Sequence, residues 1–200
     1  MADADKVASE NRLKLLALCS IEGIHWHVLA REAQREGGLD RLLAAQVSEH
    51  STDGEETRSR LEAGLGTMES RIETAATEVE RASAEANASL VTILDEDFPS
   101  NLRVVPSPPP FLFYQGRLSR DDTRSVAVVG TRKASEEGLH RAGKLAERLT
   151  HHGVTVTSGL ARGIDTAAHE ATLAHGGRTT AVVGTGILKT YPKENAKLDG

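Results

Sequence analysis

The sequence predicts an α/β protein in which a parallel sheet of about three strands follows a small all-α domain. Three β-branched apolar runs between residues 125 and 192 each end in a glycine-bearing loop: VAVVGTR, VTVTSGLARGID and TTAVVGTGILKTYP. They lie roughly 25 to 30 residues apart with helical sequence between them, which is typical of successive βα units. Such sheets bind ligands at the carboxyl ends of their strands, so the three loops are the candidate site.

Composition limits the class of protein. At 200 residues with 38% apolar content, the chain can form one or two domains. No apolar run reaches the roughly 18 residues of a membrane span, and the acidic start MADADK is unlike a signal peptide. We therefore expect a cytoplasmic protein without membrane contact. The single cysteine, Cys19, excludes an internal disulfide and a cysteine-rich zinc site, and its apolar neighbours predict a core position.

Charge is distributed unevenly along the chain. The net charge is −5, but residues 1–124 carry 14 Lys/Arg against 22 Asp/Glu, a balance of −8. Residues 125–200 carry 10 against 7, a balance of +3. Whole-chain charge does not favour a polyanion, so any nucleic-acid contact must be a local basic patch in the glycine-loop segment.

Residues 1–88 are predicted to form the helical domain. The polar segment SEHSTDGEET is expected to be a linker, and a long amphipathic helix over residues 61–86 follows it, either packed on its own domain or in a coiled coil. The turn at Gly23 has a helix-hairpin-helix (SAM-like) pattern, which either contacts a nucleic-acid phosphate or only caps the helices. Apolar spacing predicts the preceding short helices at Arg12 to Leu18, His27 to Arg35 and Leu39 to Val47.

Residues 89–200 form the second predicted domain, in which a proline-rich strap leads into the sheet. After a short β-type run at Leu90 to Leu94, prolines exclude a regular helix and favour extended geometry. Most aromatic residues of the chain lie here. They predict a strap held down by aromatic burial, with a proline-rich partner motif as the alternative. The aromatic residues are Phe98, Phe111, Phe113 and Tyr114.

Six motifs in this order resemble the DprA/Smf family of DNA-processing proteins: FPSNL, PPPFLFYQG, VAVVGTR, SGLARGIDTAAH, GGRTTAVVGTG and YPKEN. The resemblance runs from about Leu90 to Leu198. It implies a Rossmann-like domain, often preceded by a small helical domain. It also implies a cytoplasmic protein that binds single-stranded DNA and hands it to the RecA recombinase in natural transformation and recombination.

The first two loops combine backbone N–H groups with an arginine. Gly130-Thr131-Arg132 precedes a helix that begins near Ser135, whose positive end attracts a phosphate. In the family this loop is usually Gly-Ser-Arg, whose arginine contacts the DNA backbone. Ser158, Gly159, Arg162 and Gly163 repeat the arrangement, and two such loops suit a polymeric phosphate chain. The alternative for the first loop is a tight turn with a solvated arginine.

The third loop contains Gly184 and Gly186 and ends in Lys189-Thr190. It fails the P-loop motif because Leu188 replaces the glycine before the lysine, and it fails the dinucleotide fingerprint, so neither ATP nor NAD is expected. In the family an aspartate usually stands at the place of Leu188. The predicted DNA contacts are Gly130, Thr131, Arg132, Ser158, Gly159, Arg162, Gly163, Gly184 and Gly186.

No catalytic motif is found, and no cofactor or metal is expected. Asp165 and His169, four residues apart, form either a structural pair or half of a metal site. Two alternatives to DNA binding stay open: a nucleotide-processing enzyme resembling the LOG family, whose Pro-Gly-Gly-x-Gly-Thr-x-x-Glu motif is absent from these residues, and a sensor of a small nucleotide.

A doubly wound sheet usually has five or six strands, and only three parallel ones are predicted here. We therefore expect either a fragment or a short relative that completes its sheet with a partner, such as a second copy in a homodimer. Family members continue with an Arg-Asn-Arg segment that is associated with dimerisation and RecA contact. The resemblance therefore implies RecA as a partner of the longer relatives, which contain that segment.

Overall fold

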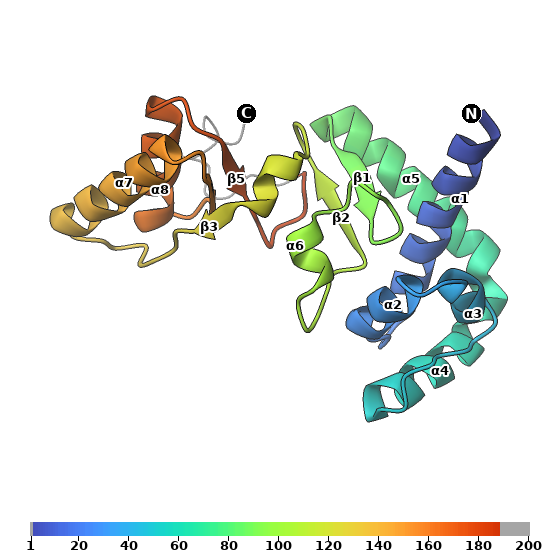
Figure 1. The fold of residues 1–200 in the computed structure, drawn as a ribbon. Helices are drawn as coiled ribbons and strands as arrows, with labels where there is room; N and C mark the ends of the chain where they lie inside the picture. Colours follow the sequence, from blue (N-terminus) through green and yellow to red (C-terminus); the bar gives the residue numbers. More distant parts are fainter. Residues whose placement is uncertain (1, 189–200) are drawn as a thin grey trace. The chain divides into compact units, whose positions relative to one another are not determined.

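The computed structural model describes residues 2–188 (Figure 1). The chain divides into two compact units, residues 1–118 and 119–200. The first unit contains all but two of the α-helices and a two-stranded antiparallel sheet, and the second contains a three-stranded parallel sheet. The domain boundary predicted after residue 88 is not tested by this division and stays a prediction. The compact units divide later, because residues 89–118 pack with the helices. None of the helices described is both long and apolar enough to cross a membrane.

Apolar helix faces build the core of the first unit. Leu15, Leu18, Leu29, Leu42 and Leu61 are fully buried in it, and Cys19 lies there as predicted. The helices of this unit before its sheet are α1 (Ala2–Cys19), α2 (Trp26–Ala33), α3 (Gly38–Leu43), α4 (Thr52–Gly64) and α5 (Met68–Ala86), with a 3-10 turn, η1 (Leu65–Thr67), between the last two.

Several helix boundaries differ from the expected ones: α1 begins at Ala2 and not at Arg12, and α3 ends at Leu43 and not at Val47. The polar linker is helical from Thr52, because the Ser51 hydroxyl accepts a hydrogen bond from Gly54 N at 3.1 Å and caps α4. The single long helix after it is broken at Leu65–Thr67. At Gly64, just before the break, the backbone approaches Ile21 closely, and a Cβ would lie 2.9 Å from the end of that side chain. Beyond the break, α5 packs on α1.

The proline-rich strap forms a hairpin inside the first unit. Strand β1 (Ser89–Thr92) pairs antiparallel with β2 (Phe111–Tyr114), and α6 (Ser100–Arg103) lies in the connection. Phe98 is 2% exposed in the helical core, which confirms that aromatic burial holds the strap. The strap does not join the parallel sheet, however, since its strands pair only with each other.

The second unit confirms the predicted βα units. Its elements are η2 (Arg120–Thr123), β3 (Ser125–Ala127), α7 (Glu136–His151), β4 (Thr155–Ser158), α8 (Ile164–Ala174) and β5 (Thr179–Ala181), and the strands pair in parallel in the order β3-β4-β5. Helices α7 and α8 pack on each other and on β4, around a small core of Val128, Ala146, Val156 and Ala168. Just beyond the ends of β3 and β5, Val129 and Val182 are more than half exposed.

Candidate functional site

The loops after β3 and β4 meet at the carboxyl edge of the parallel sheet. Ile164 N donates a hydrogen bond to the Thr131 carbonyl at 3.3 Å. A Cβ at Gly130 would lie 2.6 Å from the Ile164 side chain. Gly163 has φ +82°, and a Cβ there would lie 2.4 Å from Thr131 O. Both glycines are therefore required by the contact between the loops, a role the sequence did not reveal.

Asp165 organises the second loop from inside. Its carboxylate is buried and accepts hydrogen bonds from Gly159 N at 3.0 Å and Ala161 N at 3.4 Å. Gly159 is one of the residues that the sequence analysis assigned to a phosphate. Ser158 is also buried, and its hydroxyl donates to the Val128 carbonyl at 2.6 Å. The interior of this loop is thus bonded to the protein itself, and any phosphate must be held from its exposed side.

Asp165 and His169, which the sequence analysis treated as a structural pair or half of a metal site, have separate hydrogen-bond partners. His169 is 2% exposed, and its Nδ1 lies 2.7 Å from Thr179 Oγ1, which donates to the Val156 carbonyl at 2.7 Å. This arrangement places the imidazole proton on Nδ1, facing β5. Burial lowers the pKa of His169, and the Asp165 carboxylate opposes that shift. His169 thus braces α8 against β5 and Asp165 holds the loop after β4, so each side chain makes structural contacts of its own.

Exposed cations surround the joined loops. Arg132 and Lys133 follow β3 and are exposed, and Arg162 is exposed on the second loop. No ion pair of the Arg132 side chain is found among residues 2–188. Lys133 was not predicted as a contact, although its position beside Arg132 in the sequence is the signal that could have identified it.

The amino end of α7 contributes less positive charge than the sequence suggested. The Ser135 hydroxyl caps the helix by accepting a hydrogen bond from Gly138 N at 3.2 Å. Glu136 and Glu137 occupy the first turn, where carboxylates balance the positive end of the helix dipole. Attraction for a phosphate at this loop therefore rests on the basic side chains.

The third loop leaves the sheet beside the second. Val182 N donates to the Ser158 carbonyl at 2.9 Å, which continues the parallel pairing past β5. Gly184 and Gly186 are exposed, and a Cβ at either would meet no atom within 4 Å. The fold of the described residues does not require these two glycines. Lys189, Thr190 and the YPKEN motif lie outside the described residues.

Comparison with known proteins gives one family. The sequence model of the DNA recombination-mediator protein A family matches residues 89–199. Protein Smf of Synechocystis sp. is 41% identical over 118 residues, which cover 57% of this chain and 30% of that protein. DNA processing protein DprA of Streptococcus pneumoniae is 44% identical over 107 residues, or 54% of this chain and 38% of that protein.

The likeness extends to a solved structure. The X-ray structure of DNA processing protein A from Streptococcus pneumoniae matches with a TM-score of 0.70 and 28% sequence identity, over 94% of this chain and 62% of that one. The helical part and the parallel sheet are thus both similar to a known fold. The sequence matches cover only about a third of the length of these curated relatives.

Proposed function

Because the chain belongs to the DNA recombination-mediator protein A family, we propose that it takes part in DNA processing by binding single-stranded DNA. The contact surface is the exposed side of the loops after β3 and β4. One observation carries this proposal. A Cβ at Gly163 would lie 3.0 Å from the Arg132 carbonyl oxygen, so the backbones that bear Arg132 and Arg162 touch.

This juxtaposition suits a phosphate chain. Two guanidinium groups on adjoining loops can each take a separate phosphate, and Lys133 adds a third positive charge. The loops are held together by the Thr131–Ile164 hydrogen bond, so the basic groups are presented from a fixed frame. Backbone contacts of this kind carry no sequence information, which predicts binding without sequence preference.

The proposal covers the binding step and no bond chemistry. By family resemblance, transfer of the DNA to RecA, dimerisation and a role in natural transformation are expected of the longer relatives, as cytoplasmic proteins. For this chain we propose the contact with single-stranded DNA alone.

Fluorescence anisotropy with a labelled thymidine oligonucleotide, measured at several salt concentrations, tests the proposal. The double variant Arg132→Ala with Arg162→Ala should bind more weakly and should reduce the log–log salt slope by about 1.4, since each phosphate contact on a single strand contributes about 0.7. A matched control, Lys144→Ala with Arg148→Ala, removes the same charge from the second half of α7 and should change the slope little.

Equal slopes for the two double variants would overturn the assignment of the site. Incubation with AMP addresses the enzyme alternative: we expect no free adenine. Release of the base would instead support a nucleotide-processing enzyme, and AMP that displaces the oligonucleotide without reacting would support a nucleotide sensor.

A further inference from the structure

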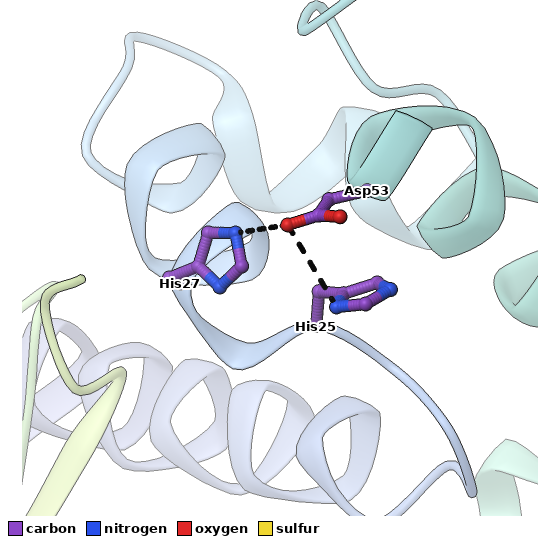
Figure 2. Close-up of side chains that lie close together, drawn as sticks. All are labelled: His25, His27 and Asp53. Carbon is purple, nitrogen blue, oxygen red and sulfur yellow. Dashed lines mark ion pairs between the residues drawn. The ribbon is translucent and has the colours of Figure 1, made fainter. Parts of the chain in front are cut away.

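Two histidines and one aspartate come together in the first unit. His25 precedes α2, His27 lies in its first turn, and Asp53 lies in the first turn of α4 (Figure 2). One ligand atom from each lies within 4.8 Å of the other two. Asp53 Oδ2 is 3.0 Å from His27 Nε2 and 4.0 Å from His25 Nδ1.

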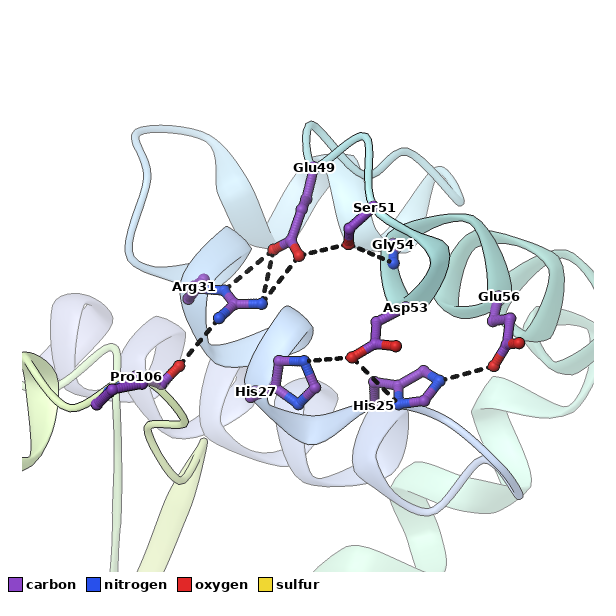
Figure 3. A network of polar contacts seen from close by, with 9 residues as sticks. All are labelled: His25, His27, Arg31, Glu49, Ser51, Asp53, Gly54, Glu56 and Pro106. Atoms are coloured by element: carbon purple, nitrogen blue, oxygen red, sulfur yellow. Dashed lines mark hydrogen bonds and ion pairs between the residues drawn. The ribbon is translucent and has the colours of Figure 1, made fainter.

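Local structure directs both imidazoles toward α4. His25 occupies the position before α2 with an extended backbone, and its side chain makes no capping hydrogen bond. Trp26, between the two histidines, donates its indole N–H to the Cys19 carbonyl at 2.9 Å. The capping by Ser51 fixes the start of α4 and therefore the position of Asp53, as Figure 3 shows.

We propose that His25 Nδ1, His27 Nε2 and the Asp53 carboxylate bind a divalent transition-metal ion of the zinc class. Bonds of about 2.0 to 2.1 Å to a tetrahedral zinc ion place neighbouring ligand atoms about 3.3 Å apart. The Asp53 separations of 3.0 and 4.0 Å bracket that value, and the two imidazole nitrogens lie within 4.8 Å of each other, so the side chains must rotate to close on an ion. Imidazole nitrogens with one carboxylate suit zinc and its neighbours better than magnesium or calcium.

The surroundings support this ligand set. His25 Nε2 lies 2.9 Å from Glu56 Oε2, the arrangement in which a carboxylate orients a metal-binding histidine and leaves its other nitrogen for the ion. The nearby Arg31 guanidinium is engaged by the Glu49 carboxylate at 2.8 Å and by the Pro106 carbonyl at 2.9 Å (Figure 3). The cluster therefore keeps a net negative charge toward an entering cation.

The site joins separate parts of the helical unit. Its ligands come from the start of α2 and the start of α4, which only packing and polar contacts otherwise hold together. All three side chains are partly exposed, so an ion can enter from solvent. A fourth position is left for water. A bound ion should stabilise the folded first unit, because it binds the folded arrangement and not the unfolded chain.

Calorimetric titration of the full chain with zinc chloride near pH 7.5 tests this proposal. We expect saturable binding of one ion and a rise in the thermal midpoint with zinc concentration. His27→Gln and Asp53→Asn should abolish both effects, and Glu56→Gln should weaken binding about tenfold. The exposed His50 lies outside the cluster, so His50→Gln is the matched control and should bind like the unaltered chain.

Substitution by cobalt keeps the test independent of stability. Three protein ligands and water should give the intense visible absorption of four-coordinate cobalt, and His27→Gln should remove it while circular dichroism shows the fold intact. Absence of saturable zinc binding would overturn the proposal and leave a plain cluster of ion pairs. Equal zinc binding by His27→Gln, Asp53→Asn and His50→Gln would overturn it as well.

Discussion

Glu32 is a carboxylate that is 2% exposed and lies on α2. Its Oε1 accepts hydrogen bonds from Arg41 Nε at 2.6 Å and Ser48 Oγ at 3.0 Å, and its Oε2 accepts one from Ser48 N at 2.9 Å. Burial raises the pKa of Glu32, but the hydrogen bonds from Ser48 and Arg41 outweigh it and hold the pKa below its usual value. One side chain thus connects α2, α3 and the segment that follows them.

Replacing Glu32 by glutamine should lower the free energy of unfolding by about 3 kcal/mol, because Arg41 then loses its buried charge partner. Chemical denaturation at pH 7 measures this. The exposed Glu36, four residues along, serves as the control, and Glu36→Gln should change stability by less than about 0.5 kcal/mol. Similar effects of the two substitutions would contradict a structural role for the Glu32 network.

The same carboxylate makes stability depend on pH in a defined direction. Since its folded pKa lies below the unfolded value of about 4.3, its contribution is present above that value and is lost as pH falls through the folded pKa. Denaturation curves between pH 6 and pH 3 should therefore show a smaller acid-induced loss for Glu32→Gln than for the unaltered chain. A parallel loss in both proteins would contradict this direction.

At the scale of elements, the joined loops depend on Gly163, whose φ of +82° and contact with Thr131 O exclude a side chain. Gly163→Ala should cost about 1 to 3 kcal/mol and weaken oligonucleotide binding by separating the two loops. Gly66 is the control, because a Cβ there meets nothing within 4 Å and this glycine is not among the predicted DNA contacts. Thermal unfolding and anisotropy together check the pair, and an unaffected Gly163→Ala would show that the loops do not need this contact.

The parallel sheet was predictable from the sequence because its signal is local. Each β-branched run lies next to its own glycine loop, and all three runs form parallel strands as predicted. The start of α4 and the break before α5 were not predicted. The capping of α4 by Ser51 is local, but the polar composition of the segment masks it, whereas the close approach of Gly64 to Ile21 is a tertiary contact that the segment alone does not specify.

The candidate site was only partly predictable for a related reason. Basic residues beside glycines are visible in the sequence, which is how Arg132 and Arg162 were found. The hydrogen bonds from the loop amides to Asp165 depend on how the loop folds, and the spacing of residues in the sequence does not specify them. The grouping of His25 and His27 with Asp53 is likewise made by the packing of α2 against α4.

On the scale of the whole molecule, the two units differ in charge. Residues 1–118 carry 12 Lys/Arg against 20 Asp/Glu, a balance of −8, and residues 119–200 carry 12 against 9, a balance of +3. The acidic unit repels a polyanion, and the basic loops lie in the other unit. This separation is consistent with the assignment of DNA contact to the parallel sheet and of cation binding to the helical unit.

The division into units also predicts what can fold alone. Val91, Ile93 and Phe98 of the hairpin region are at most 3% exposed in the helical core, and burial of each contributes about 1.5 to 3 kcal/mol. Their sum is comparable to the 5 to 15 kcal/mol that stabilises a typical domain. A chain of residues 1–118 should therefore unfold cooperatively on heating, whereas residues 1–88, the helical domain predicted from sequence, should lack a cooperative transition. Circular dichroism and calorimetry of the two chains check this, and a cooperative transition in residues 1–88 would show that the helices form a core without the hairpin.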